Sequence, residues 1–325
     1  MYLKRDHNPF RLKRNDKEDM TQLELIFLGT GGSWPTVQRN VTSIALKRGG
    51  DVLLFDCGEG TQRQIQKSSL SYMQISRIFI SHFHGDHFLG LSGLLQTMQL
   101  NDRKDPVHIY GPAGMDELAV KLVTLGYFKP TFPIFSHEVY DKDSLSFEDF
   151  YIDVLSTDHG VPSVAYRYRE AFRPGKFDKP KALALGIPEG PLFSKLQRGT
   201  AIELSNGKKI FPEMVLGKKR PGRTIVISGD TKPVDSMVSF AEHADVLIHE
   251  ATFDESLRER ANDYGHSTAK QAAEIAAKAK VDQLVLTHLS PRYLSIKQLK
   301  KDAEEVFSPV IIPRDLDFLS VKLKQ

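Results

Sequence analysis

One short segment concentrates residues that bind metal ions. Residues 81–87 read Ser-His-Phe-His-Gly-Asp-His, an H-x-H-x-D-H pattern. Alternation along an extended segment puts His82 and His84 on one side, and the glycine turn lets Asp86 and His87 face a second position. Imidazole and carboxylate ligands suit Zn²⁺ best, with Mn²⁺ or Fe as substitutes. The spacing predicts a metal site, and the alternative, a set of surface histidines, is disfavoured because the pattern is rare by chance.

A site for two metal ions needs more ligands than these four. Three further candidates each follow an apolar segment that reads as a strand. Open α/β sheets place their ligands beyond the carboxyl ends of strands, so these residues can converge on the first motif. Singly, each is more often a cap or a satisfied core residue, but together they complete a di-metal site. The candidates are His159 in Asp158-His159-Gly160, Asp230 in Ser228-Gly229-Asp230-Thr231, and His288 in Thr287-His288-Leu289.

The hydrophobic pattern predicts the elements that must position these residues. Apolar runs bounded by turn residues predict strands, and two runs around Gly49-Gly50 predict a hairpin. Thr268 and Gln271 have the spacing of a capping box at a helix start. Mixed strands and helices indicate an α/β protein with two sheets covered by helices. The predicted strands are Leu23–Leu28, Ser43–Lys47, Val52–Phe55, Ile75–Ser81, Val107–Tyr110, Tyr151–Leu155, Val164–Tyr168, Thr224–Ser228, Val246–His249 and Leu284–Thr287. The predicted helices are one from about Phe88 to Leu100, one that follows Gly111-Pro112 and ends at Leu125, and one over Ser267–Lys280.

Composition narrows the class of protein. The 325 residues include 44 Lys+Arg and 41 Asp+Glu, a net charge of +3, with 40% hydrophobic residues, which excludes a disordered, collagen-like or coiled-coil chain. The single cysteine, Cys57, excludes an intrachain disulfide and a cysteine-based zinc site, and suits the reducing cytoplasm where we expect the protein. No apolar run approaches the ~18 residues of a membrane helix, so no membrane partner is expected. Residues 1–19 alternate in charge and are predicted to form a mobile extension before a catalytic domain over residues 20–325.

One region differs in charge from the rest of the chain. Residues 167–223 contain 14 Lys+Arg and five Asp+Glu, a net charge of +9, so the remaining residues carry −6. The region is also rich in Pro and Gly, which predicts an inserted, partly irregular arm. A solvated loop is the plain alternative, but the opposite sign of the rest of the chain favours an anion-binding surface.

Several motifs resemble those of the metallo-β-lactamase superfamily and, within it, the short form of the ribonuclease Z family of tRNA 3′-end endonucleases. The histidine and aspartate set alone identifies the superfamily, whereas DCGEGTQ, HEAT and GHST with the basic arm are far more specific. The resemblance implies an αββα four-layer sandwich with an inserted flexible arm that grips precursor tRNA, and a homodimer. The motifs are FLGTGG, PTVQRN at residues 35–40, DCGEGTQ at 56–62, SHFHGDH, DHG, GDT, HEATF at 249–253, GHST at 265–268 and HLSPRY at 288–293.

The resemblance also implies a role for each ligand. Two Zn²⁺ ions per subunit would be held, with Mn²⁺ as a substitute. Asp56 would brace the ligand loop as a residue outside the ligand set. In the family arrangement His82, His84 and His159 hold one ion, Asp86, His87 and His288 hold the other, and Asp230 bridges them.

Phosphodiester hydrolysis further needs a proton acceptor and a proton donor. We expect Asp86 to be the general base, since a carboxylate beside the attacking water can take its proton. His266 is the expected general acid because it precedes a helix outside the ligand set, and Glu250 would orient it and support its charged form. The products would be a tRNA with a 3′-hydroxyl and a trailer with a 5′-phosphate. Trp34 could stack on RNA, but packing in the fold is the favoured reading.

Two alternatives remain open from the sequence. Another di-zinc hydrolase of the superfamily, such as a β-lactamase or thioester hydrolase, is disfavoured because the basic arm does not suit a small neutral substrate. A non-catalytic RNA-binding member is disfavoured because the ligand set is complete and Asp86, Glu250 and His266 are all present.

Overall fold

The computed structural model describes residues 22–324, so the predicted extension over residues 1–19 lies outside the described residues. The chain divides into two compact units. The larger contains the described residues up to Arg169 and from Arg223 onwards, and the smaller is Glu170–Gly222. No helix within residues 22–324 is both long and apolar enough to cross a membrane.

The larger unit is built on two seven-stranded mixed sheets. The first has the order β16-β1-β2-β3-β4-β5-β6 and the second the order β15-β14-β13-β12-β9-β8-β7. The strands of the first sheet are β1 (Leu23–Gly29), β2 (Ser43–Arg48), β3 (Asp51–Phe55), β4 (Ile75–Phe79), β5 (Val107–Gly111), β6 (Ile134–Glu138) and β16 (Phe318–Ser320). Those of the second are β7 (Ser144–Ser146), β8 (Phe150–Ser156), β9 (Val164–Glu170), β12 (Thr224–Ile227), β13 (Val246–Glu250), β14 (Leu284–Thr287) and β15 (Val310–Ile311).

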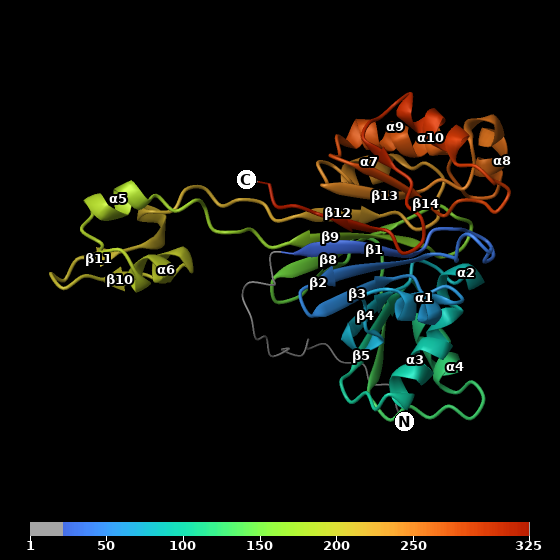
Figure 1. Ribbon diagram of the computed structural model, residues 1–325, viewed down its shortest axis with the longest axis horizontal. Helices are drawn as coiled ribbons and strands as arrows, with labels where there is room; N and C mark the ends of the chain where they lie inside the picture. The colour runs from blue at the N-terminus through green and yellow to red at the C-terminus, as the bar shows by residue number, and fades with distance from the viewer. Residues whose placement is uncertain (1–21, 325) are drawn as a thin grey trace. The chain divides into compact units, whose positions relative to one another are not determined.

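Helices cover the outer face of each sheet, as Figure 1 shows for α1, α3 and α4 on one side and α7, α9 and α10 on the other. The layer order helix–sheet–sheet–helix is that of the predicted four-layer sandwich. The helices of the first side are α1 (Thr61–Lys67), α2 (Gly85–Phe88), α3 (Gly90–Leu100) and α4 (Met115–Val123), and those of the second are α7 (Asp235–Phe240), α8 (Arg258–Asp263), α9 (Ala269–Ala279) and α10 (Lys297–Glu304).

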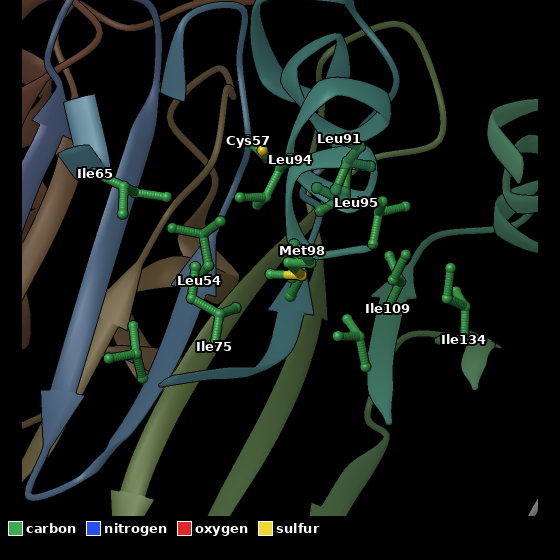
Figure 2. Packing of buried hydrophobic residues seen from close by; sticks show 14 of the residues in the cluster. Leu54, Cys57, Ile65, Ile75, Leu91, Leu94, Leu95, Met98, Ile109 and Ile134 are labelled. Carbon is green, nitrogen blue, oxygen red and sulfur yellow. The ribbon is translucent and has the colours of Figure 1, made fainter. Parts of the chain in front are cut away.

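Three buried apolar clusters hold these layers together. The cluster between the first sheet and its helices includes Leu54 and Met98 (Figure 2). The cluster between the two sheets contains Phe79 from the first and Tyr166 from the second. The third joins strands of the second sheet to α7, α9 and α10. Burial of apolar surface in three layers supplies the rigid frame on which the strand ends are placed.

The helix expected from about Phe88 begins earlier than predicted. Helix α2 starts at Gly85, with His84 as its N-cap, and α3 follows from Gly90. Asp86 and His87 therefore lie in a first helical turn rather than in a loop. A carboxylate is favoured there because the helix N-terminus carries a partial positive charge. The capping box of Thr268 and Gln271 is present at α9 as predicted.

The smaller unit has an apolar core of its own. It contains α5 (Lys179–Ala184), α6 (Pro191–Gln197) and a two-stranded ladder of β10 (Ile202–Glu203) and β11 (Lys209–Ile210). Six buried side chains pack together within it, namely Ala182, Ile187, Leu196, Ile202, Ile210 and Val215. This segment is therefore more ordered than the irregular arm that Pro and Gly indicated.

The compact unit is narrower than the basic region read from the sequence, residues 167–223. Arg167 and Arg169 lie in β9, and their Nε atoms are 2.9 and 3.2 Å from Asp153 Oδ2. Arg223 is buried and donates to the carbonyl of Val321 at 2.9 Å. These three cations are used inside the larger unit, so Glu170–Gly222 carries 11 Lys+Arg and five Asp+Glu, a net charge of +6.

Candidate metal centre and active site

The seven predicted metal ligands all follow the carboxyl ends of strands. Strand β4 leads into the segment with four of them, and β8, β12 and β14 each lead to one more. Strands β12, β13 and β14 are parallel neighbours, so their carboxyl ends meet at one edge. The structure brings into overlapping clusters His82, His84, Asp86, His87, His159, Asp230 and His288.

Two groups of three ligands can be separated within this set. In the first, His84 Nδ1 is 3.1 Å from both His82 Nε2 and His159 Nε2. In the second, Asp86 Oδ2 is 3.2 Å from His288 Nε2 and 3.7 Å from His87 Nε2. These groupings are the two ligand sets that the family resemblance implies.

Asp230 lies between the two groups. Its Oδ2 atom is 3.2 Å from His288 Nε2 and 3.3 Å from His87 Nε2, both in the second group. The same oxygen is 3.7 Å from His159 Nε2 and 3.8 Å from His82 Nε2, both in the first. One carboxylate therefore faces both groups, as a bridging ligand must.

Outward hydrogen bonds set which ring nitrogen faces the centre. His159 Nδ1 is 2.6 Å from the carbonyl oxygen of Gly265, which can only accept, so Nδ1 carries the proton. His87 Nδ1 likewise lies 2.8 Å from Asp56 Oδ2. In both rings Nε2 is therefore the nitrogen directed inward. Second contacts of this kind orient histidine ligands of metals and raise their basicity.

A relay of the same type orients His288. The Thr252 hydroxyl donates to Glu250 Oε2 at 2.6 Å and so accepts from His288 Nδ1 at 2.9 Å. The Nε2 atom of His288 is again the one that faces the ligand set. Thr252 was not singled out from the sequence, although it lies inside the HEATF motif two residues after Glu250.

Two buried polar atoms in the centre lack a hydrogen-bond partner among the described residues, His87 Nε2 and Asp230 Oδ1. Buried polar groups of that kind are costly unless something binds them. The donors available are nitrogen and oxygen atoms alone, which suits a divalent cation such as Zn²⁺. The residues present therefore fit a metal ion.

The pKa shifts favour the ligand form for His82, His84 and Asp230 but not for His87. Burial lowers the pKa of His82 well below its usual value and also lowers that of His84, so both rings are neutral. Burial would raise the pKa of Asp230, but His288 and His87 beside it hold that pKa well below its ordinary value. Neutral imidazole and ionised carboxylate are the forms that bind metals. Burial would lower the pKa of His87, but Asp230 and Asp56 raise it well above its ordinary value, so metal binding there requires loss of a proton.

His266 and Glu250 form a second functional pair beside the ligands. His266 Nδ1 is 2.9 Å from Glu250 Oε1, which also accepts from the amide of Thr231 at 3.0 Å. Burial lowers the pKa of His266, but the Glu250 carboxylate outweighs it and raises that pKa to about 9. His266 is therefore protonated at neutral pH, with Nδ1 committed to Glu250 and Nε2 left as a second donor.

Asp56 braces the ligand segment, as predicted. Its Oδ1 accepts from the amide of Ser81 at 2.7 Å and its Oδ2 from the Ser81 hydroxyl at 2.9 Å, in addition to the contact with His87. These bonds join the end of β3 to the end of β4 and fix where the ligand segment starts.

A backbone donor to Asp86 could not be foreseen. The amide of Ser33 donates to Asp86 Oδ2 at 2.6 Å, and Ser33 has a positive φ of 69°. No side-chain pattern encodes such a contact. The glycine-rich motif FLGTGG just before Ser33 is the one signal in the sequence that the backbone turns tightly there.

The favoured packing of Trp34 is wrong. The residue is 62% exposed and lines a cleft of about 200 Å³ together with Val37 and Leu294, which are also exposed. Its loop is held by backbone contacts near Gly31 and Gly32, and no buried apolar cluster within residues 22–324 includes the indole. The cleft also includes Leu289 and Ser290, directly after the predicted ligand His288.

Comparisons with known proteins agree with this geometry. One family model, described as anti-Pycsar protein Apyc1, matches residues 23–123, and another, described as a beta-lactamase superfamily domain, matches residues 207–289. A ribonuclease Z of Methanosarcina acetivorans is 46% identical over 300 residues, which cover 92% of this chain and 98% of that protein. A ribonuclease Z of Pyrococcus horikoshii is 45% identical, with 92% and 96% covered. The chain belongs to the ribonuclease Z family.

Structural similarity supports the same assignment. The crystal structure of human tRNase Z, short form, matches with a TM-score of 0.68 and 30% identity, covering 92% of this chain and all of that one. The ribonuclease Z resemblance and the α/β metallo-β-lactamase fold predicted from the motifs are therefore confirmed. The fold and the histidine–aspartate clusters together indicate a divalent metal ion.

Proposed function

We propose that this chain is an endoribonuclease that removes the 3′ trailer from precursor tRNA, leaving a 3′-hydroxyl on the tRNA and a 5′-phosphate on the trailer. The observation that carries the proposal is a complete set of seven convergent ligands in a chain with near-full-length identity to proteins named ribonuclease Z. The hydrogen bonds that orient His87, His159 and His288 from outside the ligand set are also present. A site that had lost its catalytic function would not need to keep them.

The proposed cofactors are two Zn²⁺ ions per subunit, with Mn²⁺ as a substitute. His82, His84 and His159 would hold one ion, Asp86, His87 and His288 the other, and Asp230 both. When bound, such a pair lowers the pKa of a water and neutralises charge on a phosphate. The all-nitrogen and oxygen donor set and the low pKa of Asp230 support this assignment.

The chain's own residues supply the proton transfers. Burial would raise the pKa of Asp86, but its contact with His288 holds that pKa below its usual value, so the carboxylate is ionised. Its place in the proposed ligand set, beside the attacking water, makes it the proposed proton acceptor. His266 donates a proton to the departing ribose 3′ oxygen. Glu250 keeps His266 charged and fixes its ring, so that Nε2 is the donating atom.

We assign binding of the RNA to two surfaces. The unit Glu170–Gly222, with net charge +6, would supply phosphate contacts. The exposed indole of Trp34, in the cleft that begins beside His288, would stack on a base of the single-stranded RNA. A homodimer and a cytoplasmic location remain predictions from the resemblance and from the single cysteine.

The test is cleavage of one precursor tRNA by metal-replete and metal-stripped protein, with the cut mapped on both products. We expect one cut at the trailer junction, a 5′-phosphate on the trailer, about two zinc ions per chain, and recovery when Zn²⁺ or Mn²⁺ is restored. Hydrolysis of a β-lactam or a small thioester, without cleavage of the RNA, would replace this function by that of another hydrolase of the superfamily. RNA binding without hydrolysis of any substrate would make the protein a non-catalytic member.

A further inference from the structure

The carboxylate of Asp315 accepts four hydrogen bonds, although it is far from the metal ligands in the sequence. Its Oδ1 accepts from the amide and hydroxyl of Thr30 at 3.1 and 2.7 Å. Its Oδ2 accepts from the amide of Asn40 at 2.6 Å and from Gln64 Nε2 at 3.0 Å. The residue is half-buried between β15 and β16, so these bonds are partly shielded from water.

The two backbone bonds hold both ends of one loop, residues 30–40. Thr30 directly follows β1, and Asn40 lies just before the return to β2. Arg39 adds a second tie, since its Nη1 donates to the Thr30 hydroxyl at 2.5 Å and to the carbonyl of Pro313 at 2.8 Å. The segment that carries Asp315 is itself bound to β1, because the amide of Leu316 donates to the carbonyl of Phe27 at 2.7 Å. The loop is therefore closed by a fixed carboxylate.

This loop reaches the proposed metal ligands two and three residues after Thr30. A Cβ on Gly32 would lie 2.4 Å from the ring of His288, so the backbone there is in close contact with that ligand. The next amide, that of Ser33, donates to Asp86 Oδ2 at 2.6 Å. Ser33 adopts a φ of 69°, a conformation that costs a non-glycine residue free energy and must be held by its surroundings.

We propose that Asp315 is a positioning residue for the hydrolytic centre, acting through the loop 30–40 on Asp86 and His288. The carboxylate fixes Thr30 and Asn40, the fixed ends hold the strained Ser33 amide in place, and that amide orients Asp86 while Gly32 limits the ring of His288. The inference rests on the proposed function for its kinetic consequence, but its structural consequence can be measured without activity.

Asp315→Asn is the informative substitution because it keeps the shape of the side chain. One oxygen becomes an NH₂ group, which then faces two donors at 2.6–3.1 Å where an acceptor is required. Asp317→Asn is the matched control. It lies two residues away, is exposed, and accepts from the amide of Arg314 at 2.8 Å rather than from the loop 30–40.

Three measurements on the full chain test the proposal. Hydrogen–deuterium exchange of the metal-free protein should be faster across residues 30–40 in Asp315→Asn than in wild type. Titration with Co²⁺, followed by its visible absorption, should show affinity about tenfold weaker for one of the two ions, the low end of the cost of disturbing contacts that orient ligands. The kcat should fall about tenfold on both precursor tRNA and a small phosphodiester, with KM for the RNA little changed.

Asp317→Asn should match wild type in all three measurements. A purely structural role for Asp315 would instead lower the melting temperature while leaving kcat and Co²⁺ affinity of the folded protein unchanged, and that result would overturn the proposal. Wild-type exchange rates over residues 30–40 in Asp315→Asn would also overturn it. If wild-type protein fails to cleave precursor tRNA, the proposed function fails, while exchange and Co²⁺ affinity still decide the role of Asp315.

Discussion

The metal centre and the compact unit Glu170–Gly222 differ in how their charged groups are held: those of the centre are buried and fixed, whereas those of the unit are exposed. In the centre the candidate ligands are mostly buried, and the outward atoms of His87, His159 and His288 are held by Asp56, Gly265 and Thr252. In the compact unit an ion pair such as Lys179–Glu189, 2.9 Å apart, is more than half exposed on both sides. Fixed, desolvated groups can perform chemistry because their geometry and protonation are set in advance. Exposed cations supply affinity that depends on salt.

Asp86→Ala should remove the chemistry and leave the binding. We expect kcat on precursor tRNA to fall by at least about 10³-fold, since the change removes a proposed ligand and a proposed base together. RNA affinity, measured by filter binding, should stay within a few-fold of wild type because the cations of Glu170–Gly222 are untouched. Near-wild-type turnover with metal restored would contradict the role of Asp86.

His266→Ala should separate acid catalysis from metal binding. We expect kcat to fall by about 10²-fold, the usual cost of losing a general acid, with the metal content per chain unchanged. The metal is measured by atomic absorption on the same sample. Loss of zinc from the variant would instead show that His266 is a ligand.

Removal of the compact unit should weaken RNA binding and leave the chemistry intact, the opposite of the effect expected for Asp86→Ala. Strands β9 and β12 pair antiparallel with Arg169 opposite Thr224, so residues 171–222 can be replaced by a short Gly-Ser turn. Removing the whole unit avoids exposing its six-residue core. We expect kcat/KM on precursor tRNA to fall about 10²-fold at low salt, while hydrolysis of a small phosphodiester persists.

A charge variant sharpens this comparison. Lys218 and Lys219 are exposed and outside the core of the unit, so changing both to Gln should leave its fold intact. The slope of log affinity against log salt should then fall by up to about one for each lysine that contacts phosphate.

For the deletion of the whole unit, equal RNA cleavage with and without the unit would show that its charge is a solvated surface. Loss of both activities would make it part of the catalytic fold.

Glu250→Gln should move the pH dependence. The pKa of His266 is raised to about 9 by Glu250, so the acid form, present at neutral pH, is lost as pH rises through that value. Without the carboxylate charge that pKa falls, and the alkaline decline of kcat should begin at lower pH. Each unit of the fall costs about tenfold in protonated His266 above the new pKa. An unchanged alkaline limb would exclude His266 as the titrating acid.

The parts of this molecule that were predictable are encoded locally. The H-x-H-x-D-H segment, the hairpin at Gly49-Gly50 and the capping box at Thr268 each depend on residues close in sequence. The short strands β7, β10, β11, β15 and β16 were missed because two or three residues carry no periodic signal. The five-residue strand β6 (Ile134–Glu138) was missed as well, and its length does not account for that.

Contacts that depend on distant backbone atoms were missed for a different reason. Asp315 and Thr30 are 285 positions apart, and the amide of Ser33 has no side-chain signature. The exposure of Trp34 follows from how its loop is tied at both ends, which residue type alone does not indicate. Sequence pattern therefore located the candidate ligands that the structure brings together, and tertiary contacts determine what holds them.

Trp34→Ala should have the smallest effect of these changes and should act on binding. Stacking of one base on an aromatic ring contributes about 1–3 kcal/mol, so KM for precursor tRNA should rise by about tenfold while kcat on a small phosphodiester stays unchanged. Trp34→Phe keeps an aromatic face and should recover most of the affinity. Val37→Ala is the control because it lies on the same loop and is fully exposed without a π face. An equal rise in KM for Val37→Ala would mean that the loop's shape, rather than the indole, contacts the RNA.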